Sequence, residues 1–107
     1  MKIPTTFQGT WRIVETDLWD EDTLDLSGPA HITFDADGGG ALAMIAIQAD
    51  LDCRFEGKRV EFSWMGDDDG TPTAGRGWAK LTGNGSLEGR IFIHRGDETE
   101  FKARQKE

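Results

Sequence analysis

The sequence predicts an all-β fold, a small antiparallel up-and-down β-barrel of about eight strands, and three observations support it. Fourteen glycines are spread along the chain and separate short runs of β-forming residues. No stretch of ten or more residues repeats its apolar positions with a helical period. A meander of this length would expose two bare sheet edges, and closure into a barrel removes both. A two-sheet β-sandwich is the alternative arrangement.

The length of the chain limits the number of its domains, and its net charge limits the classes of partner that it can bind. The 107 residues suffice for one domain, residues 1–107, with one core. A net charge of −8 argues against nucleic acid and against an anionic membrane as partners, because both require a positive surface. The same charge suits a basic protein partner. One cysteine allows no internal disulfide, and no apolar segment resembles a signal peptide or a membrane span, so we expect a cytoplasmic protein.

The first half of the chain yields three expected strands. They are expected at residues 8–16, 30–34 and 41–48, with a short helical turn near 19–22 and a glycine-rich turn at 35–39. No strong turn signal lies between 41–48 and Leu51, so the third strand is expected to end there or to continue as one long bent strand.

The hairpin at residues 51–64 is the most sharply predicted unit. Apolar and polar residues alternate on both of its arms, and Gly57-Lys58 forms the turn. One register gives an apolar inner face and an outer face of opposite charges, so it is strongly specified. It pairs Phe55 with Val60, Cys53 with Phe62 and Leu51 with Trp64 inside, and Glu56 with Arg59 and Arg54 with Glu61 outside.

The last part of the chain predicts a second hairpin and a closing strand. We expect residues 66–74, which include Asp67-Asp68-Asp69, to form a flexible loop. Strands at 75–82 and 86–94 then form a hairpin around Gly83-Asn84-Gly85, and the last strand covers 98–104 after a turn at 95–97.

Two resemblances add to this prediction. Gly9-Thr10-Trp11 resembles the Gly-x-Trp signature of calycin barrels, the lipocalins and avidins, and implies a calycin-like barrel in which Arg104 or Lys102 packs over the Trp ring. The chain has no Tyr, which biotin-binding avidins use, so we infer no ligand from this likeness. Most of the chain also resembles a group of short, acidic bacterial proteins of unassigned function. That likeness rests on residues 9–13, 31–35, 51–54, 60–64 and 75–78.

The sequence predicts no catalytic, metal or cofactor site. Asp35-Ala36-Asp37-Gly38 lacks the further ligands of a calcium loop, and Asp67–Asp69 is typical of a solvated loop. His31, His94 and Cys53 are too few and too scattered for a zinc site. The thiol alternates with apolar neighbours, so we expect it to be buried and unreactive. An enzyme is therefore the minority interpretation.

The hairpin 75–94 carries the main functional hypothesis. One face is smooth and apolar and is expected to point inward; it consists of Gly75, Gly77, Ala79, Leu81, Leu87, Gly89, Ile91 and Ile93. The opposite face combines aromatic rings with scarce basic groups, which are typical anchors of protein interfaces. Its candidate binding residues are Arg76, Trp78, Arg90, Phe92 and His94. We expect a non-catalytic binding protein that engages a protein partner, or itself, through this face.

A small-ligand carrier is the alternative. The inward glycines and alanine of the same hairpin contribute little volume, so the interior is either filled by large side chains or left as a cavity. In a carrier, Trp11, Trp64 and Trp19 would lie at the barrel mouth. If the hairpin faced the other way, its basic and aromatic residues would instead line a pocket for an anionic ligand.

Overall fold

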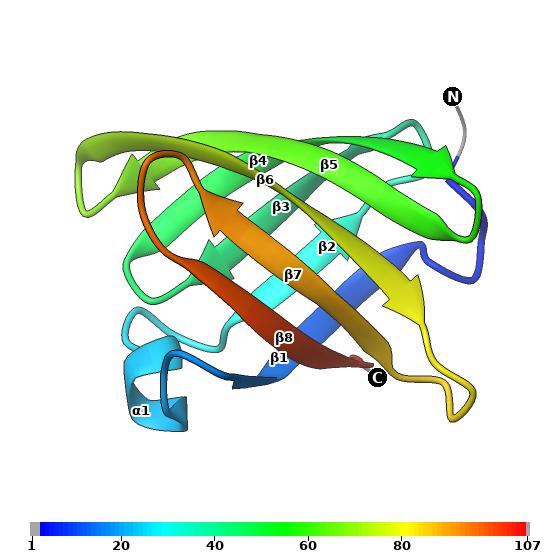
Figure 1. The fold of residues 1–107 in the computed structure, drawn as a ribbon, viewed down its shortest axis with the longest axis horizontal. Coiled ribbons are helices and arrows are strands. Elements are labelled where there is room, and N and C mark those ends of the chain that lie inside the picture. Colours follow the sequence, from blue (N-terminus) through cyan, green and yellow to red (C-terminus); the bar gives the residue numbers. More distant parts are fainter. Residues whose placement is uncertain (1–2, 107) are drawn as a thin grey trace.

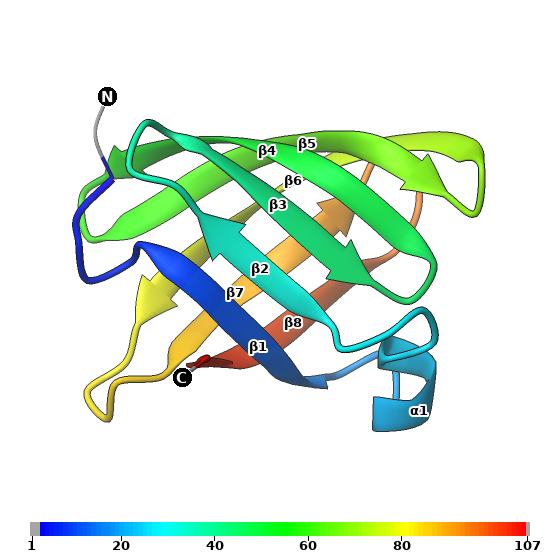
Figure 2. The same ribbon diagram turned by 180° about the vertical axis from the view of Figure 1, so that it is seen from behind.

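The chain forms a closed antiparallel barrel of eight strands, as predicted, and not a sandwich (Figures 1 and 2). The structure is a computed structural model, which describes residues 3–106. Each strand pairs with the next along the chain, and β1 pairs with β8 to close the sheet. The elements are β1 Gly9–Thr16, α1 Glu21–Leu24, β2 His31–Phe34, β3 Gly39–Met44, β4 Ile47–Glu56, β5 Arg59–Asp68, β6 Thr71–Leu81, β7 Leu87–Ile93 and β8 Glu98–Gln105.

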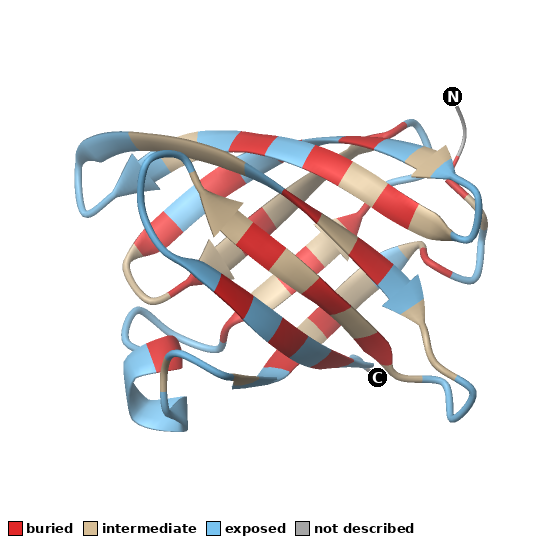
Figure 3. Ribbon diagram, viewed as in Figure 1, coloured by how far each residue is buried: buried red, intermediate tan, exposed pale blue. Residues whose placement is uncertain are grey.

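The hairpin of β4 and β5 has the predicted register. Its inner pairs are Phe55 with Val60, Cys53 with Phe62 and Leu51 with Trp64, and its outer pairs are Glu56 with Arg59 and Arg54 with Glu61. The alternation of buried and exposed residues that fixes this register continues around the barrel (Figure 3).

The expectation of one strand at 41–48 was wrong. The chain turns at Ile45-Ala46 and separates β3 from β4, which pair with each other as a hairpin. Ile45 has φ of 51°, in the left-handed region that β-branched residues rarely adopt. The turn is held in part by the Ile45 amide, which donates to the carbonyl of Leu24 at 2.8 Å.

The expectation of a flexible loop at 66–74 was also wrong. β5 and β6 remain paired out to Asp68 and Thr71, and only Asp69-Gly70 forms the turn. β6 pairs with β7 only from Gly75 onward, so residues 71–74 extend as a ribbon past the end of β7 (Figure 1). Pro72 lies on this free stretch and has no N–H to offer another strand, which protects the edge from strand pairing.

The connection between β1 and β2 closes the end of the barrel that holds α1. Leu24, the last residue of α1, is 1% exposed and packs into the core. Asp25 fixes the segment because its carboxylate accepts from the Arg12 guanidinium and from the Ala30 amide. No helix in residues 3–106 is long and apolar enough to cross a membrane.

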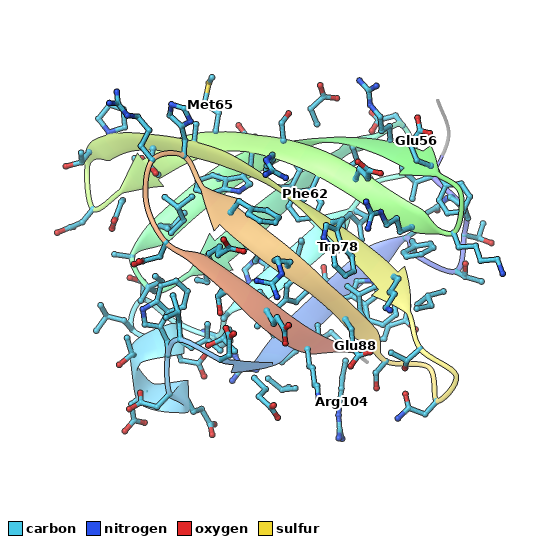
Figure 4. The ribbon with its side chains drawn as sticks, viewed as in Figure 1. Glu56, Phe62, Met65, Trp78, Glu88 and Arg104 are labelled. Atoms are coloured by element: carbon cyan, nitrogen blue, oxygen red, sulfur yellow. The ribbon has the colours of Figure 1, made fainter. Side chains whose placement is uncertain are left out.

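The N-terminal segment covers the other end. Ile3 and Phe7 are buried, and Trp11 Nε1 donates to the carbonyl of Phe7 at 2.9 Å. Trp11 is buried in the interior, whereas Lys102 is exposed on the outer face of β8. Arg104 is exposed on the same face (Figure 4). The basic side chains therefore lie on the opposite side of the sheet from the Trp11 ring, and neither covers it as the calycin resemblance implies.

Aromatic rings occupy the space that the interior glycines leave. A Cβ on Gly75 would lie 2.6 Å from the Trp64 ring, and a Cβ on Gly77 would lie 2.6 Å from the Phe62 ring. A Cβ on Gly89 would lie 2.7 Å from the Phe101 ring. Small residues on β6 and β7 thus make room for large residues on β5 and β8. Of the two expected arrangements, a filled interior and a cavity, this packing favours the filled interior.

Candidate functional site

The outer face of the β6–β7 hairpin is oriented as predicted. Gly77 and Ala79 are buried inside the barrel, so Trp78 between them lies on the outer face (Figure 4). The register places Trp78 opposite Arg90 and Arg76 opposite Phe92. Four of the five surface candidates are thereby brought together as cross-strand neighbours. The fifth, His94, directly follows β7 and is exposed at the end of the same hairpin.

Both outward aromatic rings are stacked against cations. The Arg59 guanidinium carbon lies 4.8 Å from the centre of the Trp78 ring, and Lys80 Nζ lies 5.9 Å from it. The Arg76 guanidinium carbon lies 4.0 Å from the centre of the Phe92 ring. Each such contact stabilises by roughly 0.5–1 kcal/mol at an exposed site. The rings are half-buried, and cationic side chains rather than the core supply their outer contacts.

Arg90 is held by two carboxylates on β8. Its two terminal nitrogens donate to Glu98 Oε2 at 2.8 Å and to Glu100 Oε1 at 2.7 Å. These pairs fix the guanidinium beside Trp78 and neutralise its charge. A hollow of about 230 Å³ lies next to them, bounded by Trp78, Lys80 and Arg90 on one side and by Glu15 and Lys102 on the other.

A second hollow, of about 570 Å³, lies at the end of the hairpin that is nearer α1. Arg76, His94 and Arg95 line it together with Phe92. Among the described residues, none of these three basic side chains has a carboxylate within 4.0 Å, whereas Arg90 has two. The outer face is therefore divided into a neutralised half around Arg90 and a cationic half around Arg76.

The two remaining candidates are inside the barrel. Trp11 is 1% exposed and Trp64 is 2% exposed, so neither contributes to the outer surface of the hairpin. Trp11 lies beneath the N-terminal segment rather than at an open mouth. Trp19 is half-buried and packs against the core from the connection between β1 and β2. Trp64 differs from Trp11 because its Nε1 is buried with no hydrogen-bond acceptor among the described residues.

Cys53 is buried, as expected from its position between apolar residues. Burial, with a smaller contribution from the carboxylates of Asp52 and Asp35, raises the pKa of the Cys53 thiol from 9.0 to about 12. A thiol in this environment is protonated at neutral pH and is a poor nucleophile. In residues 3–106, no group of three or more His, Cys, Asp or Glu side chains is arranged to hold a metal ion.

The Cys53 environment predicts slow thiol chemistry in the folded protein. At pH 8, we expect a disulfide reagent such as DTNB to label the folded chain at least about a hundredfold more slowly than the denatured chain, because the thiolate fraction is far smaller. Rapid labelling of the folded chain would contradict the burial of Cys53.

The same shift predicts a pH dependence of stability. The folded state keeps the Cys53 proton to a higher pH than the unfolded state, so the free energy of unfolding is expected to fall as the pH rises from 9 towards 12. Denaturant titrations at several pH values measure this slope. Cys53→Ala is the control, and its slope over this range should be smaller.

Sequence reasoning missed several members of this surface. Arg59, Glu98 and Glu100 contact Trp78 or Arg90 from β5 and β8, and Arg95 joins Arg76 at the second hollow. Glu98 and Glu100 fall on the predicted last strand, so pairing that strand with 86–94 could have found them. Arg95 was placed in a turn and carried no signal.

Comparison with family models, with curated proteins and with solved structures finds no match to this chain. The functional conclusion therefore rests on the geometry of the barrel and of its outer face.

Proposed function

We propose that this chain is a non-catalytic binding protein that engages a protein partner through the outer face of the β6–β7 hairpin. The observation that carries the proposal is the pair of arginine–aromatic stacks, Arg59 on Trp78 and Arg76 on Phe92. Tryptophan and arginine are the residues most enriched among interface anchors. Stacking keeps these side chains ordered before binding, which lowers the entropic cost of association.

The neutralised half of the face suits this role. Arg90 is paired at the surface with both Glu98 and Glu100, so a partner that covers Arg90 does not bury an unpaired cation. The hollow beside Trp78 offers a recess for one apolar side chain of the partner.

Site-specific photo-crosslinking in the native host cells tests the proposal. A benzophenone amino acid is introduced in place of Trp78 or Phe92, and in the control in place of Asp52, which is exposed on the outer face of β4. We expect crosslinked adducts from the two hairpin positions and none from the control position. Adduct mass then shows whether the partner is another protein or a second copy of the chain.

Equal adduct yields from all three positions, or no adduct from either hairpin position, would contradict the proposal. Trp78→Ala provides a complementary readout because it removes the stack without touching the core. It should abolish crosslinking from position 92 and leave cooperative unfolding intact.

A small-ligand carrier is a second candidate, and Trp64 is the observation that favours it. A buried indole N–H without an acceptor costs about 1–3 kcal/mol, which a bound acceptor group would recover. Native mass spectrometry of the gently purified protein tests this candidate. A bound mass that is lost in Trp64→Phe, which removes only the donor, would support a ligand beside Trp64. A bare chain mass at native conditions would count against it.

A further inference from the structure

We propose that the partner of the cationic half of the hairpin is a second copy of this chain, whose β5–β6 turn binds there. This inference rests on the proposed function, because it names a partner for the same face. We call Arg76, His94 and Arg95 the basic patch, and Asp67, Asp68 and Asp69 the acidic tip.

The basic patch gathers basic side chains without an ion pair at one place, whereas the other arginines that lack one among the described residues, Arg54 and Arg104, lie on β4 and β8. Arg12, Arg59 and Arg90 each form an ion pair with at least one carboxylate. The three side chains of the basic patch have none within 4.0 Å among the described residues, although aspartates and glutamates outnumber lysines and arginines by 20 to 12 in the chain. They surround a hollow of about 570 Å³ with Phe92 at its edge. The patch therefore has both the charge and the room for a carboxylate-bearing segment.

The acidic tip has the complementary properties. All three of its carboxylate residues are exposed, and they lie at the turn of the ribbon that extends past β7 (Figure 1). The ribbon is hydrogen-bonded between β5 and β6 to its last pair, Asp68 with Thr71, so the tip is presented on a paired strand and not on a loose loop.

The tip and the patch lie at the same end of the barrel and close together. The ribbon leaves the hairpin at Ala74, whose carbonyl accepts from the His94 amide at 2.8 Å. Thr71 is three residues from Ala74 along β6, which corresponds to about 10 Å, and Asp68 lies opposite Thr71 on β5. A surface with adjacent negative and positive groups can pair with a second copy about a twofold axis, because the acidic tip of each copy then meets the basic patch of the other.

The same adjacency argues against an unrelated acidic segment as the occupant. Such a segment would bring carboxylates to the patch and also beside Asp67–Asp69, which would repel it. The acidic tip of a second copy meets the same repulsion, but that copy also brings a basic patch that binds Asp67–Asp69 of the first copy, and this attraction offsets the repulsion. The net charge of −8 on each copy opposes approach at long range, but salt screens charges beyond about 8 Å at physiological ionic strength. The contact is made by side chains, since Pro72 denies the ribbon edge to strand pairing.

Sedimentation velocity over a concentration series at physiological salt tests the proposal with two charge-reversed variants. The patch variant is Arg76→Glu with Arg95→Glu, and the tip variant is Asp67→Lys with Asp68→Lys. Each variant alone is expected to dimerise at least tenfold more weakly than the unmodified chain. An equimolar mixture of the two is expected to recover the dimer, because the introduced glutamates of one chain then face the introduced lysines of the other.

Two control variants change the net charge by the same amount as the patch and tip variants, at exposed positions outside the patch and the tip. Arg54→Glu with Arg104→Glu matches the patch variant, and Asp50→Lys with Asp52→Lys matches the tip variant; both should dimerise within about threefold of the unmodified chain. Recovery in the mixture also shows that the two variants are folded.

A chain that stays monomeric throughout the series, or a dimer that neither variant weakens, would overturn the inference. Crosslinking from positions 78 and 92 to a different protein, with no dimer in sedimentation, would leave the proposed function standing and remove this inference alone. Crosslinks to a second copy from position 92 but none from position 78, together with a dimer that both variants disrupt, would exclude the Trp78 half of the face from the interface and keep the tip-to-patch contact.

Discussion

Replacing Trp11 with alanine is expected to lower the free energy of unfolding by about 3–5 kcal/mol, which is a large fraction of the stability of a domain of this size. Trp11 is 1% exposed and is among the largest fully buried side chains of the described chain. Its loss would leave a cavity at the end of the barrel that the N-terminal segment covers. It would also remove the Nε1 hydrogen bond to Phe7, which anchors that segment.

Equilibrium denaturation in urea measures the effect, and Trp11→Phe is the matched control. Phenylalanine keeps most of the ring volume and loses the donor, so we expect a smaller cost, on the order of 1–2 kcal/mol. Hydrogen exchange at the Phe7 amide should accelerate in both variants. Equal stability of Trp11→Ala and the unmodified chain would mean that the N-terminal segment and Trp11 do not close the barrel.

Replacing Gly89 with alanine is expected to destabilise the barrel by about 3 kcal/mol, although the change adds a single methyl group. The new Cβ would lie 2.7 Å from the Phe101 ring and would also press on the carbonyl oxygen of Trp78. The ring could shift, but the carbonyl belongs to the β6 backbone that pairs with β7. The cost therefore arises from backbone displacement as well as from side-chain crowding.

Gly83→Ala is the control for Gly89→Ala. Gly83 lies in the turn between β6 and β7, and no other group lies within 4 Å of its added Cβ. Thermal unfolding should give a melting temperature close to that of the unmodified chain for Gly83→Ala and one several degrees lower for Gly89→Ala. If the two variants unfolded at the same temperature, the close packing of Gly89 on Phe101 would be refuted.

The parts of the fold that were predicted are those in which neighbouring residues constrain one another. The register of the β4–β5 hairpin follows from alternation on both arms, since a one-residue slip would bury Arg54 and expose Phe55. The same period of two placed Trp78 and Gly77 on opposite faces, and the expectation that the apolar face points inward was confirmed. Closure of the barrel followed from the number of strands and the cost of bare edges.

The parts that were missed depend on contacts between distant segments. The turn at Ile45-Ala46 has no local signal, and its left-handed Ile is supported by a hydrogen bond from the Ile45 amide to Leu24 across the end of the barrel. Residues 66–74 have the composition of a loop, yet strand pairing extends through them because β4 supports β5 on its other side as far as Ile47 and Asp68.

The sequence by itself determined which side chains of the hairpin of β6 and β7 share a face, because the side-chain period of a strand is two, and it favoured an inward position for the smoother apolar face. Only the tertiary structure decided which of those side chains are neutralised, since Glu98 and Glu100 reach Arg90 from β8 and Arg59 reaches Trp78 from β5. It likewise decided that rings from β5 and β8 fill the room left by the glycines, and that the acidic tip lies beside the basic patch. Such contacts are set by the order of strands around the closed sheet, which alternation within one strand does not encode.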